Sequence, residues 1–310
     1  MPLTGSAVDL RLKSVLLATD LSPASVKPLH HALAVARHYR AKLYVAHVVS
    51  PVPYLMAGPG VLQLGCESAS RGLQQLQWDL QQNSSLSGLD HEFVIRCGCV
   101  WDELKELITE AQIDLVVVGT HGRRGVEKVL LGSVAEQIFR DSECPVLTVG
   151  PHSYSEGRVE FTGETRTYLF ATDFGEASLN ALPHAVSLAR KFSARLILAH
   201  VVPAAPTPQI PGWNSASEVT LMRENARMTC LRRLEKLVAG NEEAPIETEF
   251  VVQFGIPSEK ILQVALNKRV ELIILGTHRE SLSGAISHMP WATTYEIVCG
   301  AGCPVLTVRQ

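Results

Sequence analysis

The chain has 310 residues, of which 46% are hydrophobic, 19% charged and 6% aromatic, and its formal net charge is −3. Such values are typical of a globular protein long enough for two domains, and the slight negative charge argues against a general nucleic-acid binder. No apolar run approaches the roughly 18 residues that a membrane span requires, and residues 1–13 lack the hydrophobic segment of a signal peptide. We therefore expect a cytoplasmic protein with no membrane span.

The seven cysteines do not form a metal-binding pattern. Cys97 and Cys99 are too close together for the usual zinc pairing, and no Cys/His pair follows at the spacing of a zinc site. We expect no metal site, and reduced thiols as in other cytosolic proteins.

The first 150 residues alternate between strand patterns and helix patterns. Short apolar or alternating runs predict strands at 15–18, 43–49, 91–96, 115–118 and 145–149. Ser22 and Pro23 are typical of a helix start, and this helix should extend to about Arg40. Further helices are expected before the third strand, at 101–111, and from Ser133. Five strands that alternate with helices favour a parallel sheet with helices on both faces.

The second half repeats the first. The segments 15–20, 43–49, 115–121 and 144–149 have counterparts at 168–173, 196–202, 272–278 and 303–308. Such internal similarity is the mark of a duplicated domain. We expect domains at 1–150 and 167–310, joined by a polar linker at 151–166. In the second half, the apolar positions of a long helix at 216–238, Leu221 and Met228 among them, should pack in the core.

Residues 114–134 carry the strongest functional motif. The apolar strand ends at Gly119, a loop follows with Gly122 and the cation Arg123, and Gly132-Ser133 then opens a helical pattern. Glycines let the backbone approach a ligand closely, and a helix start offers free N–H groups to an anion. The motif predicts a phosphate-binding loop at the carboxyl end of a strand, where open α/β sheets bind ligands. A glycine-rich turn without a ligand is the alternative.

The spacing of Gly119, Gly122, Gly132 and Ser133 resembles the ATP-binding signature of the universal stress protein family, and the repeat extends this resemblance over almost the whole chain. It implies an α/β fold of two tandem doubly wound, Rossmann-like domains, each a five-stranded parallel sheet with strand order 3-2-1-4-5 and helices on both faces. It also implies that ATP is the ligand, with Mg²⁺ bridging its phosphates.

The resemblance implies a set of nucleotide contacts in the first half: Ala18, Thr19, Asp20, Val48, Gly119, His121, Gly122, Arg123, Gly132, Ser133 and Val134. Asp20 would accept hydrogen bonds from the ribose hydroxyls, and the backbone of Val48 would face the adenine. Plainer roles remain open: a cap or turn for Asp20, a turn-stabilising hydrogen bond for His121, and a solvated charge for Arg123. His47 and His200 lie on apolar strands and should be hydrogen-bonded core residues.

The second half departs from the signature. After Gly276 the sequence has Arg279 where a glycine is required, and Met289-Pro290 where Gly-Ser is required. A side chain at position 279 would obstruct the backbone approach, and proline lacks the N–H that a helix start offers. We expect this half to keep the fold without this mode of nucleotide binding.

The fifth strand of each half is a short apolar edge, and members of the resembled family commonly dimerise through it. We expect the two halves to pair with each other as an intrachain pseudo-dimer; a homodimer and an unknown protein partner remain open. The family resemblance favours a stress-response or signalling protein that uses ATP as a regulatory switch. The alternatives are a weak ATPase or phosphotransfer enzyme, and a scaffold whose second half binds another small ligand. We assign no catalytic residue, because neither a Walker lysine-serine pair nor an evident general base is present.

Overall fold

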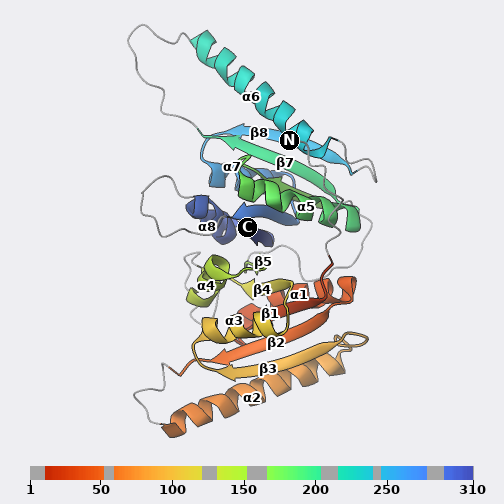
Figure 1. Cartoon of the computed structure of the whole chain (residues 1–310), viewed down its shortest axis with the longest axis vertical. Coiled ribbons are helices and arrows are strands. Elements are labelled where there is room, and N and C mark those ends of the chain that lie inside the picture. Colours follow the sequence, from red (N-terminus) through yellow and green to blue (C-terminus); the bar gives the residue numbers. More distant parts are fainter. Residues whose placement is uncertain are drawn as a thin grey trace.

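The computed structural model describes residues 11–51, 59–120, 131–151, 166–203, 216–239, 246–277 and 290–309. Figure 1 shows an elongated molecule with the two halves of the chain at opposite ends. The first half contains β1 (Ser14–Ala18), the 3₁₀ turn η1 (Pro23–Ser25), α1 (Val26–Tyr39), β2 (Lys42–Val49), α2 (Pro59–Gln82), β3 (His91–Cys97), α3 (Val100–Glu110), β4 (Leu115–Gly119), α4 (Ser133–Asp141) and β5 (Val146–Val149).

The second half repeats this alternation of strands and helices. Its elements are β6 (Thr167–Ala171), α5 (Glu176–Lys191), β7 (Arg195–Val202), α6 (Ala216–Val238), β8 (Thr248–Phe254), α7 (Pro257–Asn267), β9 (Leu272–Thr277), α8 (Pro290–Gly300) and β10 (Val305–Arg309). The five strands predicted in the first half are all present, and their ends differ from the prediction by one residue at most.

The strands form one continuous sheet in the order β3-β2-β1-β4-β5-β10-β9-β6-β7-β8. Each half has the predicted five strands in the order 3-2-1-4-5 with parallel neighbours, and the two five-stranded halves join edge to edge. The unpaired edges β5 and β10 join in antiparallel register, with Leu147 opposite Leu306. The hydroxyl of Thr148 donates to the carbonyl of Val305 across this junction (3.1 Å). The two halves therefore pair within the chain, as predicted.

Each face of the sheet is covered by four of the helices that the structure describes. The cluster on one face includes side chains of α1, α2, α5 and α6, and the cluster on the other includes side chains of α3, α4, α7 and α8. Strand residues alternate between the two, so Leu17 belongs to the first cluster and Leu16 to the second. Both side chains are almost fully buried, which explains why these strands are apolar without interruption.

Helix α6 has the predicted ends, but the prediction that its apolar positions pack in the core is only partly right. Leu234 is fully buried, whereas Leu221 and Met228 are 63% and 44% exposed. In Figure 1, α6 lies beyond the last strand of the sheet, and its beginning points away from the rest of the molecule. The described α6 residues that pack against the core lie in its later turns, so periodicity alone overestimated its buried surface.

The expectation of reduced thiols is wrong for two of the cysteines. The structure pairs Cys66 of α2 with Cys97 of β3 as a disulfide, because α2 packs along β3 (Figure 1) and brings together residues 31 positions apart in the sequence. Cys99 is exposed, whereas Cys303 is buried, and burial raises the pKa of the Cys303 thiol to about 12. No helix among the residues described is long and apolar enough to span a membrane.

Candidate functional site

The carboxyl ends of β1 and β4 lie side by side in the sheet. Ala18 pairs with Ala46 of β2 on one side and with Val118 of β4 on the other. The chain leaves β1 towards β2 and returns from β3 to β4 on the opposite side, so β1 and β4 flank a topological switch point. Thr19 directly follows β1, and Gly119 ends β4. The predicted residues of these two strand ends therefore meet at one edge of the sheet.

The loop after β1 is fixed by hydrogen bonds. The N–H of Thr19 donates to the carbonyl of Ala46 (3.0 Å), and Nδ1 of His47 donates to the carbonyl of Thr19 (2.8 Å), since a carbonyl can only accept. The Thr19 hydroxyl accepts from the N–H of Leu21 (3.0 Å), whose φ of 59° is uncommon for a branched apolar residue. His47 is buried and hydrogen-bonded, as predicted.

Asp20 builds the turn that leads into η1. Its Oδ1 accepts from the N–H of Ser22 (2.9 Å) and from the hydroxyl of Ser25 (2.7 Å). Ser22 stands at the predicted N-cap position, but its side chain makes no cap bond. Asp173 makes the same turn in the second half, where its Oδ1 accepts from the N–H of Gly175 and the hydroxyl of Ser178 (both 2.8 Å). The turn role therefore occurs in both halves, and ribose contact by Asp20 stays a prediction.

Helix α4 begins at the same edge of the sheet, at the predicted residue. Gly132 precedes the helix, and its N–H donates to the carbonyl of Thr120 (2.9 Å), which directly follows β4. Ser133 is exposed and Val134 is half-buried. The first N–H groups of a helix have no partner within it, and Gly132, the residue at the N-cap position, has no side chain to cap them. The positive end of α4 therefore lies next to the end of β4.

The second half holds α4 at both ends. Arg309 of β10 donates from its guanidinium to two carbonyls at the end of α4, where a positive charge complements the helix dipole. At the other end, the backbone of Leu131 lies beside Tyr295 and Cys299 of α8. Burial raises the pKa of both side chains, and hydrogen bonding with Leu131 partly offsets this. The tandem partner thus helps to position the helix start.

Val48 completes the edge on the side of β2. It packs with Ala18 and Val134 against the core cluster that includes α3 and α4, so three of the predicted residues, from three elements, lie on the same face of the sheet. Val48 pairs in register with Arg96 of β3.

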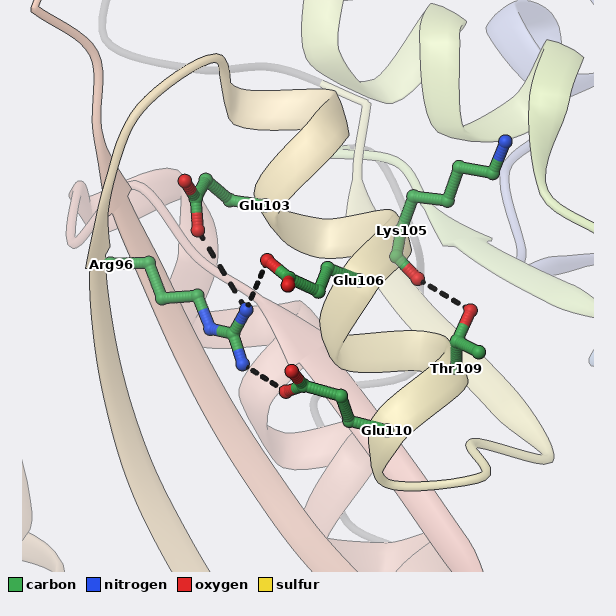
Figure 2. Close-up of polar contacts among 6 residues, drawn as sticks. All are labelled: Arg96, Glu103, Lys105, Glu106, Thr109 and Glu110. Atoms are coloured by element: carbon green, nitrogen blue, oxygen red, sulfur yellow. Dashed lines mark hydrogen bonds and ion pairs between the residues drawn. The ribbon is translucent and has the colours of Figure 1, made fainter.

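Arg96 is engaged by three glutamates of α3 (Figure 2). Its Nη1 lies 3.0 Å from Glu106 and 3.7 Å from Glu103, and its Nη2 bonds Glu110. The hydrogen bond with Glu110 is the main reason that the pKa of Arg96 is raised. These residues are spaced to share one face of the helix. Arg96, which pairs with Val48, therefore links β3 to α3 through these ion pairs.

Three predicted residues, His121, Gly122 and Arg123, lie outside the described residues, and their contacts stay predictions. Where the structure describes side chains, no group of three or more His, Cys, Asp or Glu could hold a metal ion.

Comparison with known proteins identifies the family. The model of the universal stress protein family matches residues 11–150 and again residues 164–309. The chain belongs to the universal stress protein family. A universal stress protein of Mycolicibacterium smegmatis is 25% identical over 307 residues, which are 95% of this chain and 96% of the relative. One of Methanocaldococcus jannaschii is 30% identical over 138 residues, 44% of this chain and 81% of the relative.

Solved structures agree on the fold. The crystal structure of a universal stress protein from Archaeoglobus fulgidus aligns with a TM-score of 0.65 at 19% identity. The alignment covers 96% of this chain and 99% of the Archaeoglobus chain. At this identity the likeness establishes the tandem α/β fold alone.

In the second half of this universal stress protein, the residue that matches Gly119 packs closely against the backbone of α5. A Cβ on Gly276 would stand 2.5 Å from the Cα of Ser178, and closer still to the carbonyl of Ala177, in the first turn of α5. The glycine is therefore required for the packing of β9 against α5. Helix α8 begins at Pro290, which has no N–H to offer.

Sequence reasoning missed the hydrogen bonds that shape the β1 loop. His47–Thr19 and Ser25–Asp20 recur as His200–Thr172 (2.7 Å) and Ser178–Asp173. The recurrence of a histidine and a serine at matching places in both halves is the signal that could have found them. His200 is only half-buried, and burial still lowers its pKa, although its hydrogen bond with the Thr172 carbonyl opposes this.

Proposed function

We propose that this universal stress protein is a regulator that binds an adenine nucleotide, ATP with Mg²⁺, at the first-half edge of its sheet. Bound nucleotide would favour one conformation or partner surface over another. The proposal goes beyond the family assignment, which makes the chain a relative of stress-response proteins without naming its ligand.

One observation carries the proposal. The loop after β1, the end of β4 and the start of α4 meet at the switch point of the first-half sheet, with Gly132 placed before an exposed Ser133. Free N–H groups at a helix start bind phosphate, and this part of an open α/β sheet is where ligands bind.

The proposed roles follow from the position of each residue. The N–H groups of Ser133 and Val134 would donate to phosphate oxygens, and Gly119 would let the phosphates approach the backbone. Asp20 would accept from ribose hydroxyls, and the backbone at Val48 would border the adenine. Residues 121–123 would complete the loop, with Arg123 adding positive charge. Mg²⁺ would be held mainly by phosphate oxygens, as is usual for this ion.

The second half supplies a matched control for the experiment. Asp20 and Asp173 build the same turn with a backbone N–H and a serine hydroxyl. Asparagine keeps an oxygen that can accept these bonds and removes the charge. Asp20→Asn should weaken binding of Mg-ATP by about tenfold or more, because hydrogen bonds to a charged group are the stronger ones. Asp173→Asn should leave binding unchanged, since its half has Arg279 and Met289-Pro290 where the first half has Gly122 and Gly132-Ser133.

The measurement is titration calorimetry with Mg-ATP on the full chain, together with the nucleotide content of the purified protein. We expect one nucleotide per chain, lost in Gly132→Glu, which places a carboxylate at the phosphate position. Two nucleotides per chain, or equal losses in the two asparagine variants, would contradict the proposal. A solved universal stress protein, 27% identical over 45% of this chain with a TM-score of 0.34, is a complex with cAMP, so cAMP is titrated beside ATP. Release of ADP from bound ATP is followed in the same samples.

A further inference from the structure

A cavity of about 140 Å³ lies between the two halves of the chain. Leu147 of β5 and Leu306 of β10 line it, and these residues stand directly opposite each other at the antiparallel junction. Helix α1 contributes His31, Ala34 and Val35. Because each half supplies part of the lining, the cavity depends on the tandem arrangement.

The lining repeats across the junction. His31 and Val35 of α1 occupy the same places in the repeat as His184 and Leu188 of α5, and all four line the cavity. The ends of the two helices meet beside it, where the ring of His38 stacks on Phe192 at 4.1 Å. The cavity therefore lies where the chain's local twofold relation brings α1 and α5 together.

The cavity is mainly apolar and has balanced charge. Its described lining holds one cation, Arg166, and one anion, Glu271. Burial lowers the pKa of His31 to about 4 and also lowers that of His184, so both imidazoles are neutral at pH 7. Desolvation disfavours the charged form of a histidine, and it would equally disfavour a charged ligand in this space.

His184 has a buried ring nitrogen at the cavity whose hydrogen bonding is incomplete. Its Nδ1 makes no well-formed hydrogen bond with a described residue, and a weaker contact with the backbone of Asn180 opposes the effect of burial on its pKa. Leaving a buried polar atom unsatisfied is costly, and such atoms in native proteins call for an explanation. A ligand with a hydroxyl group would supply the missing partner.

We propose that this cavity binds a neutral molecule with a single aromatic ring and one hydrogen-bonding group, of which phenol is the simplest example. The volume decides the size, because an apolar cavity of about 150 Å³ holds one benzene molecule. Tyr39, Tyr168 and Phe192 supply aromatic surface for the ring, and His184 supplies the polar contact.

This site is separate from the proposed nucleotide site. In the first half the cavity includes Leu115, the first residue of β4, whereas the nucleotide edge includes Gly119, the last. The rise of a strand separates these two residues by about 13 Å. The inference therefore stands whether or not the protein binds ATP.

The test titrates phenol into the full chain at pH 7 by calorimetry, with ligand-observed NMR as a second readout. We expect one phenol per chain with a dissociation constant between about 10 μM and 10 mM, the range open to a ligand of this size. Benzoate, which carries a charge, should bind at least about tenfold more weakly. His184→Leu should weaken phenol by about tenfold and leave toluene, which lacks the hydroxyl, nearly unchanged.

Two filling variants locate the site. Ala34→Leu on α1 and Leu188→Phe on α5 should each abolish phenol binding, and either one suffices if the other does not fold. Leu266→Phe on α7 is the control, because Leu266 is 64% exposed and outside the cavity. Absence of phenol binding by the unaltered chain would overturn the inference. Binding that persists in the filling variants, or benzoate binding as tight as phenol, would overturn it too.

Discussion

His31 lies on α1 beside the junction of the two halves, and its imidazole should make the protein sensitive to mild acid. Burial is the largest cause that lowers its pKa, from 6.5 to about 4, and the neighbouring charges of His30 and Lys27 act in the same direction. The folded-state pKa lies below the unfolded value, so between these two pH values the unfolded chain binds a proton at His31 and the folded chain does not. The contribution of neutral His31 to the free energy of unfolding is therefore present above pH 6.5 and is lost as the pH falls towards 4.

The size of the effect follows from the two pKa values. Each unit of difference between the folded and unfolded pKa corresponds to about 1.4 kcal/mol of unfolding free energy, and more than half of the resulting loss occurs above pH 5. His31 alone should therefore lower the free energy of unfolding by at most about 2 kcal/mol between pH 7 and pH 5. His38, His184 and His200 also have pKa values lowered mainly by burial, so the whole protein should lose more than this.

The variant His31→Gln isolates the contribution of this one residue. Glutamine keeps a polar side chain but does not take up a proton, so the variant should lose about 2 kcal/mol less than the unaltered chain between pH 7 and pH 5. Urea unfolding at pH 7, 6 and 5, followed by circular dichroism, gives the free energies. The contributions of the other histidines cancel in the comparison.

His30→Gln is the control, because His30 is exposed and its charge is only a secondary cause of the lowered pKa of His31. This variant should keep most of the loss in acid. If His31→Gln and the unaltered chain lose the same stability between pH 7 and pH 5, the burial argument for His31 is refuted.

Two further substitutions test the packing. Gly276→Ala should destabilise the protein by at least about 2 kcal/mol, because the new Cβ meets backbone atoms of α5 that cannot rotate away; an unfolding midpoint equal to that of the unaltered chain would contradict the packing of β9 on α5. Cys66→Ser should lower the free energy of unfolding by about 3 kcal/mol under oxidising conditions, since the disulfide closes a loop of 31 residues. Reductant should remove this difference, and a difference that survives reduction would show that the bond is not its source.

The elements of each domain could be predicted from the sequence because they depend on near neighbours in the chain. Unbroken apolar runs such as 115–118 are typical of strands covered on both faces, and these strands are buried in the structure. Gly132-Ser133 predicted a helix start, and α4 begins at Ser133. The repeat, together with the family resemblance, gave the strand order of each half correctly.

The candidate site was predictable only in part. The sequence named the ends of β1, β2 and β4 and the start of α4, and parallel strands bring such ends to one edge. The hydrogen bonds of His47 with Thr19 and of Ser25 with Asp20 could not be derived, because their geometry depends on the exact path of the loop.

The tertiary structure alone decided what depends on residues far apart in the sequence. It set the antiparallel register of β5 against β10, paired Cys66 with Cys97, and left the beginning of α6 outside the core. It also formed the cavity between α1 and α5, whose lining comes from both halves. The physical reason is the same in each case: periodicity shows that a surface is apolar, but only the packed chain determines what covers it.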